Sequence, residues 1–255
     1  MDMGTAAGEA RFIADEWLGE RLGKPAYHLS GRPADLGADQ WAMARSVTPV
    51  FLDAKIAVDD RVGAGLLVQA GFSLIDTLLT FDAPIGRLRH GGPPHPGLDV
   101  GFVLPAEESA VVDIAGAVFG MDRYYRDPMI SKAAASRMKR DWAANYFRGQ
   151  RGRWMVVARD GGRVVGFLQL LYLDGRYMFI DLIAVAPSHM GQGVGKAMIA
   201  YAVDHCPDVD TVIVGTQAVN IPAARLYETM GFRLTSLQHV FHCHGGGAAI
   251  DAPDR

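Results

Sequence analysis

The stretch 181–199, DLIAVAPSHMGQGVGKAMI, constrains the fold of this 255-residue chain more than any other part of the sequence. Its first residues are apolar and predict a strand that ends before Pro187, because proline cannot donate a hydrogen bond to a strand ladder. Three glycines follow, and the apolar spacing from Lys196 onward predicts a helix. A glycine-rich turn between a strand and a helix lets the unpaired N–H groups of the first helical turn approach an anion closely. The stretch therefore predicts an α/β unit with a phosphate-binding loop, although a tight turn that needs glycine only for its backbone would look the same.

A second pattern lies downstream of this loop. Residues 211–216 predict another strand, and NIPAARLYETMGF at 220–232 predicts a short helix that ends at Gly231. The G-x-G-x-G loop differs from both the Rossmann and the Walker A spacing. Taken in order, however, these elements resemble the GCN5-related N-acetyltransferases, the GNAT family. The resemblance covers residues 100–244 and implies an α/β fold with a mixed, mostly antiparallel central sheet flanked by helices.

The GNAT resemblance implies acetyl-CoA as the cofactor. Its pyrophosphate would be bound by the loop amides, Asn220 would help to hold it, and Tyr227 would protonate the leaving thiolate. A phenol suits that step because its pKa of about 10 lies above that of a thiol, whereas a tyrosine that only packs on the core is the alternative. The family usually has Arg or Gln before the first glycine, and Met190 stands there in this chain, so one donor or charge is missing. The implied cofactor-binding residues are Ile183, Ala184, Val185, Met190, Gly191, Gln192, Gly193, Val194, Gly195, Lys196, Asn220 and Ala223.

Asp181 is the candidate general base, because it lies in the strand that leads to the loop. A carboxylate there could take a proton from an acceptor amine, directly or through water, and an ion pair on the strand face is the alternative. The sequence shows no constellation for a nucleophilic Cys or Ser, so we expect direct transfer. On the last strand His242 and His244 share one face and Cys243 lies on the other, because strand side chains alternate. We expect the two histidines to line the acceptor site and to bind no metal, with packed or exposed histidines as the alternative.

The charge distribution indicates an anionic small-molecule acceptor. Residues 121–153 include nine basic and three acidic side chains, whereas the whole chain has a net charge of −3. A basic border suits an anionic acceptor, and a solvated helix face is the alternative. Arg123 and Arg126 are the expected contacts, since they flank Tyr124 and Tyr125, whose rings could stack on a base or a sugar.

Four segments resemble the sugar-nucleotide branch of the GNAT family, namely 70–81, 119–130, 142–145 and 215–220. That resemblance implies the amine of a nucleotide-linked amino sugar as the acceptor. Rival acceptors are a protein N-terminus, a small amine or an antibiotic. A non-catalytic sensor that only binds acyl-CoA is a rival of another class, and the presence of Tyr227 argues against it.

Residues 51–81 repeat, without a gap, the pattern of residues 211–241. Gly71 and Phe72 fall on Gly231 and Phe232, but Leu67 falls on Tyr227 and the first copy has no glycine loop. We therefore predict an N-terminal domain that is a partial, non-catalytic GNAT-like repeat, with chance similarity as the alternative. The predicted organisation is an N-terminal α/β domain at 1–85 that begins with a helix at 11–22, a Pro/Gly linker at 86–100, the GNAT domain at 101–244 and a flexible tail at 245–255.

The composition limits which partners and which cellular location we expect for this protein. A net charge of −3 argues against a nucleic-acid partner, and no apolar run is long enough to span a bilayer. The N-terminus lacks the basic start and apolar core of a signal peptide. The two cysteines, Cys206 and Cys243, are too few for a disulfide framework and are expected to be reduced thiols. We expect a cytoplasmic enzyme with no membrane partner, and a homodimer stays open.

Overall fold

The computed structural model describes residues 9–45, 47–88 and 97–246, and their contacts divide the chain into two units. Unit 1 takes residues 1–78, 126–130 and 237–255, and unit 2 takes residues 79–125 and 131–236. Two strands, β4 (Ser73–Pro84) and β10 (Arg233–Gly245), run from one unit into the other.

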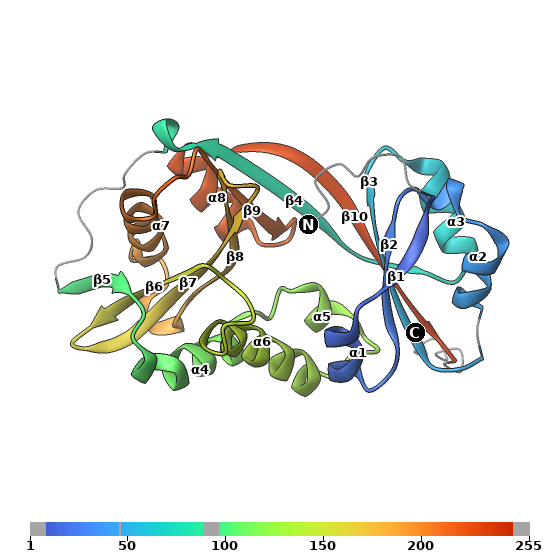
Figure 1. Ribbon diagram of the computed structural model, residues 1–255, viewed down its shortest axis with the longest axis horizontal. Helices are drawn as coiled ribbons and strands as arrows, with labels where there is room; N and C mark the ends of the chain where they lie inside the picture. The colour runs from blue at the N-terminus through green and yellow to red at the C-terminus, as the bar shows by residue number, and fades with distance from the viewer. Residues whose placement is uncertain (1–8, 46, 89–96, 247–255) are drawn as a thin grey trace, which may run out of the picture. The chain divides into compact units, whose positions relative to one another are not determined.

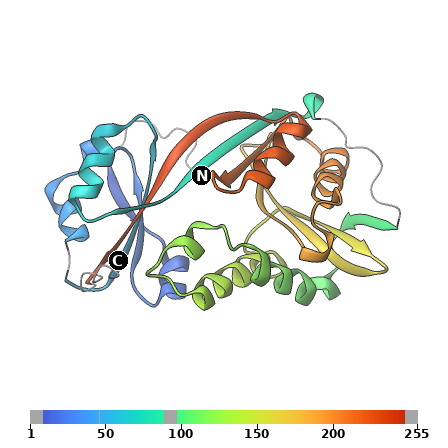
Figure 2. The same cartoon turned by 180° about the vertical axis from the view of Figure 1, so that it is seen from behind.

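Unit 1 is a small α/β unit whose strands lie in the order β1-β2-β3-β10. β2 is parallel to β3, and the other pairs are antiparallel. Alternate residues of β3 and β10, such as Leu52 and Phe241, pack against α2 and α3 in one core. The ribbons of α2 and α3 lie together on one side of the strands of this unit (Figure 2). Its elements are β1 (Arg11–Ala14), α1 (Glu16–Leu22), β2 (Ala26–Ser30), η1 (Pro33–Asp35), α2 (Ala38–Ala44), β3 (Val50–Ala57) and α3 (Arg61–Gln69).

The start of unit 1 corrects the helix predicted at 11–22. Residues 11–14 form β1 and pair with β2, so that Phe12 lies opposite Leu29, and only residues 16–22 are helical. The break is at Asp15, whose carboxylate accepts a hydrogen bond from the N–H of Leu18 at 2.9 Å and so caps the helix. An N-cap residue leaves the helical conformation, and the apolar residues before it are free to join the sheet.

Unit 2 contains the predicted mixed, mostly antiparallel sheet, in the order β4-β9-β8-β7-β6-β5. The ladders of β5 through β8 are antiparallel, and β8 and β9 are parallel. Its other elements are η2 (Ile85–Arg87), β5 (Leu98–Phe102), η3 (Pro105–Glu107), α4 (Glu108–Val118), α5 (Arg123–Arg126), α6 (Lys132–Phe147), β6 (Trp154–Asp160), β7 (Arg163–Leu173), β8 (Tyr177–Val185), η4 (Pro187–His189), α7 (Val194–His205), β9 (Thr211–Gln217) and α8 (Ile221–Met230).

Helices cover both faces of this sheet. Val156 of β6 points into a core with α7 and α8, whereas its neighbours Met155 and Val157 point into a second core with α4 and α6. The ribbon of α7 lies on one side of this sheet and the ribbons of α4 and α6 lie on the other (Figure 1). The period-2 alternation of strand side chains produces the two cores. Both faces are apolar, which matches the continuous apolar runs of β6 and β7.

The secondary structure of the two similar segments agrees element by element. β3, α3 and β4 occur in the first, and β9, α8 and β10 occur in the same order in the second. Asp60 and Asn220 cap the two helices through side-chain oxygens, and Gly71 and Gly231 follow them with φ of 89° and 97°. The interpretation of the first segment as a partial repeat stays a prediction.

The division by contacts differs from the predicted domain boundaries. Residues 237–245 belong to unit 1 because β10 pairs there with β3, from Gln238 opposite Ala57 to Gly245 opposite Val50. Most of the predicted linker (89–96) and of the predicted tail (247–255) lies outside the described residues. Within the described part of the chain, no helix combines the length and the apolar character that crossing a membrane would require.

Candidate active site

The predicted phosphate-binding loop lies in unit 2 between η4 and α7. Gly191 and Gly193 have φ of 76° and 80°, a left-handed conformation that favours glycine, and Gly193 is the N-cap of α7. An added Cβ at either position would meet no atom within 4 Å, so the glycines are required by backbone conformation rather than by packing. Gly195 differs, because a Cβ there would lie 3.3 Å from the side chain of Leu226. The first turn of α7 therefore packs closely against α8, the helix that carries Tyr227.

The strand before the loop has a backbone edge that does not pair with the neighbouring strand β9. β8 and β9 pair only from Tyr177 opposite Thr211 to Ile180 opposite Val214. β8 nevertheless continues to Val185 and β9 to Gln217, so these ends do not pair with each other in the described ladder. Ile183, Ala184 and Val185, three of the predicted cofactor-binding residues, lie in this part of β8. Unpaired strand groups can accept an extended ligand that carries amides.

Tyr227 lies on α8 and is 1% exposed. Its ring packs against Phe81 and Phe232, with centroid distances of 5.8 and 5.6 Å. Burial raises the pKa of its phenol, because the charged phenolate is poorly solvated there. The phenol therefore stays protonated at neutral pH and can donate a proton, but burial makes it a weaker acid than an exposed tyrosine.

Asn220 begins the same helix. Its side-chain oxygen accepts a hydrogen bond from the N–H of Ala223 at 3.3 Å, so it has a structural role as the N-cap of α8. Its predicted role in holding a cofactor stays a prediction, as does that of Ala223. In the loop itself Met190 is exposed and Lys196 is half-buried at the start of α7, and Gln192 donates to the carbonyl of Ser188 at 2.9 Å.

Asp181 accepts four hydrogen bonds. Arg151 donates two of them, both at 2.7 Å, and Trp142 and Gln169 donate at 2.9 and 3.0 Å. The Asp181 side chain is only 2% exposed. Its role as general base stays a prediction, and a proton from an amine would have to replace one of these donors.

The residues predicted to bind the acceptor fall in both units. In unit 2, Tyr124 is 3% exposed, and Arg123 stacks on its ring and donates to its hydroxyl at 2.6 Å. In unit 1, the Arg126 side chain is 39% exposed and lies 3.7 Å from the carboxylate of Asp76. The buried ring of Tyr124 is therefore not open to stack on a ligand in this structure, whereas Arg126 remains accessible.

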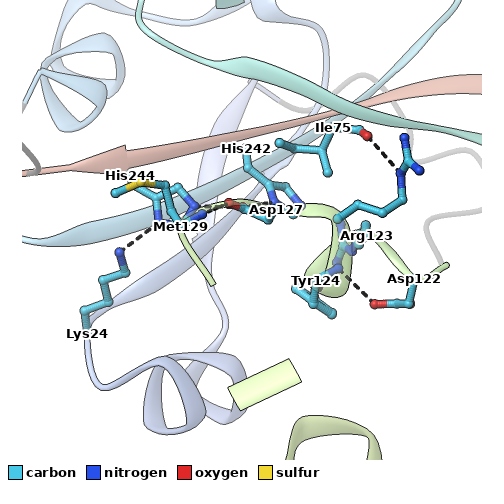
Figure 3. A network of polar contacts seen from close by, with 10 residues as sticks. Lys24, Ile75, Asp122, Arg123, Tyr124, Asp127, Met129, His242 and His244 are labelled. Atoms are coloured by element: carbon cyan, nitrogen blue, oxygen red, sulfur yellow. Dashed lines mark hydrogen bonds and ion pairs between the residues drawn. The ribbon is translucent and has the colours of Figure 1, made fainter. Parts of the chain in front are cut away.

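His242 and His244 lie together in unit 1, on opposite sides of one carboxylate (Figure 3). Asp127 Oδ2 lies 2.6 Å from His242 Nδ1 and 2.8 Å from His244 Nε2, and Oδ1 accepts from the N–H of Met129 at 2.8 Å. His244 Nδ1 in turn lies 2.9 Å from Lys24 Nζ. Cys243 lies in the apolar core on the other face, as the alternation predicts.

These ligand atoms of Asp127, His242 and His244 lie within 4.8 Å of one another, close enough for a metal ion. An imidazole that binds a metal through Nε2 keeps its hydrogen on Nδ1. In His244 that nitrogen faces the ammonium of Lys24, which can only donate. The arrangement fits a chain of hydrogen bonds from Lys24 through His244 to Asp127 better than it fits a metal centre.

Sequence reasoning missed three contributors to these clusters. Gln169 could have been found, because it is a polar residue within the apolar run of β7. Arg151 was visible only as one of nine basic residues. Lys24 gives no signal, since 220 positions separate it from His244 and only the fold brings them together.

Comparisons with known proteins find a family and several relatives to which this chain is similar. The model of the acetyltransferase (GNAT) family matches residues 120–232. The spore coat polysaccharide biosynthesis protein SpsD of Bacillus subtilis is 33% identical over 161 residues, which are 62% of this chain and 52% of that protein. The chain thus spans about half the length of this curated relative.

Two solved structures share the fold at low sequence identity. A conserved protein of unknown function from Staphylococcus epidermidis has a TM-score of 0.68 and 15% identity over 95% of this chain and 94% of its own. A tandem GNAT protein from the clavulanic acid biosynthesis pathway has a TM-score of 0.61 and 16% identity over 89% of this chain and 77% of its own.

Proposed function

This chain belongs to the acetyltransferase (GNAT) family, and on that premise we propose that it transfers an acetyl group from acetyl-CoA directly to an amine. The proposal rests on one observation, the close packing of α7, which follows the glycine loop, against α8, which carries Tyr227. Gly195 in the first turn of α7 contacts Leu226, the residue before Tyr227. An anion-binding turn and a protonated phenol thus come from adjacent helices of one unit.

The residues of unit 2 fit acetyl-CoA. The left-handed Gly191 and Gly193 and the N-terminus of α7 would hold its pyrophosphate, and the unpaired edge of β8 at 183–185 would hold its extended amide chain. The cofactor supplies the acetyl group as a thioester. Met190 contributes no charge to the loop, so pyrophosphate binding would rest on backbone N–H groups and the helix dipole.

Side chains of this protein would donate and accept the protons that the reaction moves. The amine nitrogen bonds to the acetyl carbon, and the carbon–sulfur bond breaks. Tyr227 Oη would donate its proton to the departing sulfur, and the amine would lose a proton to Asp181 or to water. The phenol is protonated at neutral pH and can therefore act as the donor, although burial makes it a weaker acid.

For the acceptor, we propose the amine of a nucleotide-linked amino sugar. The net charge of +6 between 121 and 153 favours an anionic acceptor, and the relative SpsD is by its name a polysaccharide biosynthesis protein. The contacts predicted from the sequence are Arg123, Tyr124, Arg126, His242 and His244. Of these, the ring of Tyr124 is buried, whereas Arg126 has an accessible charge. A protein N-terminus, a small amine or an antibiotic is the alternative acceptor.

The test is a screen for CoA release. The protein is mixed with acetyl-CoA and with dTDP-, UDP- and GDP-linked amino sugars, free amino sugars and simple amines, and the free thiol and the acetylated product are measured. Turnover with a nucleotide-linked sugar, and a much lower kcat/KM for the free sugar, is the expected result. Equal kcat/KM values would refute the acceptor, and tight acetyl-CoA binding without turnover on any amine would indicate a sensor.

A further inference from the structure

We propose that Arg151 binds the anionic group of the acceptor, a phosphate in the nucleotide-linked substrate proposed above. The inference rests on the proposed function and names the contact that would recognise its acceptor. Arg151 was not singled out in the sequence, and it lies in the turn between α6 and β6.

The position of Arg151 is fixed by a bulge in β8. In the ladder with β7, Gln169 lies opposite Leu182 and Leu170 lies opposite Ile180, so Asp181 is the extra residue. A bulge re-aims a side chain, and the carboxylate of Asp181 holds the guanidinium of Arg151 through two bonds of 2.7 Å. A bidentate pair fixes the plane of the guanidinium as well as its place.

Further contacts hold the same arginine. The ring of Trp142 lies 4.8 Å from the guanidinium carbon, and Trp142 also donates to Asp181. The backbone N–H of Arg151 donates to the carbonyl of Asn145 at 3.1 Å. The side chain is therefore held before any ligand arrives, which lowers the entropic cost of binding.

Arg151 is held without being buried. Its side chain is 38% exposed, whereas that of Asp181 is 2% exposed. Only two of its five N–H groups are used, since Nη1 makes no hydrogen bond to any described residue. Asp181 neutralises one charge, but Arg148 and Arg153 in the same turn leave a positive local balance. An anion therefore meets both fixed donors and a positive field.

The cluster also contains an unsatisfied acceptor. Gln169 is fully buried, and its Nε2 donates to Asp181 at 3.0 Å. Its Oε1 has no hydrogen-bond partner among the residues that the structure describes. Buried polar atoms are nearly always paired, so this acceptor indicates that a ligand N–H or O–H group completes the cluster.

Three other cations of the basic stretch are engaged elsewhere. Lys139 is buried in an ion pair of 2.8 Å with Asp122, and Arg140 pairs with Asp113 at 2.7 Å on the surface. Arg123 stacks on the buried ring of Tyr124. Arg151 is the member of the stretch that combines two short bonds to a buried carboxylate with accessible donors.

The proposal is tested by calorimetric titration of dTDP into the protein saturated with CoA, so that the cofactor site is occupied. Arg151→Gln should raise the Kd for dTDP by about 10- to 100-fold, the effect of losing a charge-assisted hydrogen bond. Arg151→Lys should recover only part of the affinity, because an ammonium lacks the planar fork of donors. The Kd for thymidine, which has no phosphate, should be the same in both variants as in the wild type.

Arg137→Gln is the matched control, since it removes one exposed charge of the same stretch. Because Arg151→Gln leaves Asp181 buried without its partner, the double variant Arg151→Gln/Asp181→Asn serves as the fold control. Unchanged CoA affinity in every variant shows that unit 2 is intact. Equal Kd values for dTDP in Arg151→Gln and Arg137→Gln, or no dTDP binding to the wild type, would overturn the proposal. CoA release in the amine screen would still test the proposed function separately.

Discussion

Asp127→Asn should destabilise the protein although the two side chains have nearly the same shape. The Asp127 carboxylate accepts three hydrogen bonds, from Met129, His242 and His244. An asparagine keeps one oxygen, which can still accept from Met129, but it turns an NH2 donor toward the imidazoles. His242 can answer by moving its own hydrogen to the other ring nitrogen. His244 cannot, because its Nδ1 must accept from Lys24.

The expected cost follows from this count. One charge-assisted bond is lost at His244, worth about 1.5–3 kcal/mol, and the bond at His242 becomes a weaker neutral one. We therefore expect Asp127→Asn to lower the free energy of unfolding at pH 7 by about 2–4 kcal/mol. Removal of the opposing donor by Lys24→Met should free His244 to change tautomer, so the cost of Asp127→Asn should fall by about 1 kcal/mol or more in that background.

Urea denaturation of the four proteins in this cycle measures both quantities. Burial alone would raise the pKa of Asp127, but the hydrogen bonds from His242 and His244 outweigh it and hold that pKa well below its usual range. A depressed pKa stabilises the fold fully above the unfolded value of about 3.9, and the contribution is lost as the pH falls through the folded value. The contribution of Asp127 to the free energy of unfolding should thus persist down to about pH 4–5 and decrease below that pH. A cost under about 0.5 kcal/mol at pH 7, or one that Lys24→Met leaves unchanged, would refute the hydrogen-bond chain.

Three further predictions concern unit 2. Gly193→Asp should weaken acetyl-CoA binding in calorimetry by at least about tenfold relative to Gly193→Asn, which has the same backbone strain without the negative charge. Equal affinities of the two variants would show that the loop does not bind the pyrophosphate. Tyr227→Phe should lower kcat by about 10²–10⁴ with acetyl-CoA affinity intact, and full turnover would leave the ring a packing role only. Burial raises the pKa of the Cys206 thiol to about 11, so iodoacetamide should modify this thiol at pH 8 only after the protein unfolds. Rapid modification of Cys206 in the native protein, detected by mass spectrometry, would contradict this prediction.

The sequence was most informative where local chemistry decides the structure. The Pro187 stop, the left-handed glycines and the helix after them predicted β8, the loop and α7, because these residues restrict the backbone directly. The two-residue alternation of strands correctly placed His242 and His244 on one face. Such features depend on neighbours in the chain, and neighbours are visible in a sequence.

Other features depend on partners that are distant in the sequence. Arg151 and Arg140 look alike in a basic stretch, yet one is held by a carboxylate on β8 and the other by a surface acid on α4. The helix predicted at 11–22 was wrong for its first turn, because β2 was not recognised as a pairing partner for residues 11–14. Pairing of β10 with β3 likewise depends on the fold rather than on local pattern.

The two strands that the units share, β4 and β10, determine how this chain can be divided into fragments. β4 starts in unit 1 and ends beside β9 in unit 2, whereas β10 starts in unit 2 and ends beside β3 in unit 1. A single cut at 89–96 would therefore separate each sheet from a strand that it needs. Neither fragment should bind acetyl-CoA or stay soluble alone, because each would expose an unpaired strand edge. Co-expressed fragments should restore binding, so the chain is suited to a split-protein reporter rather than to domain-by-domain truncation.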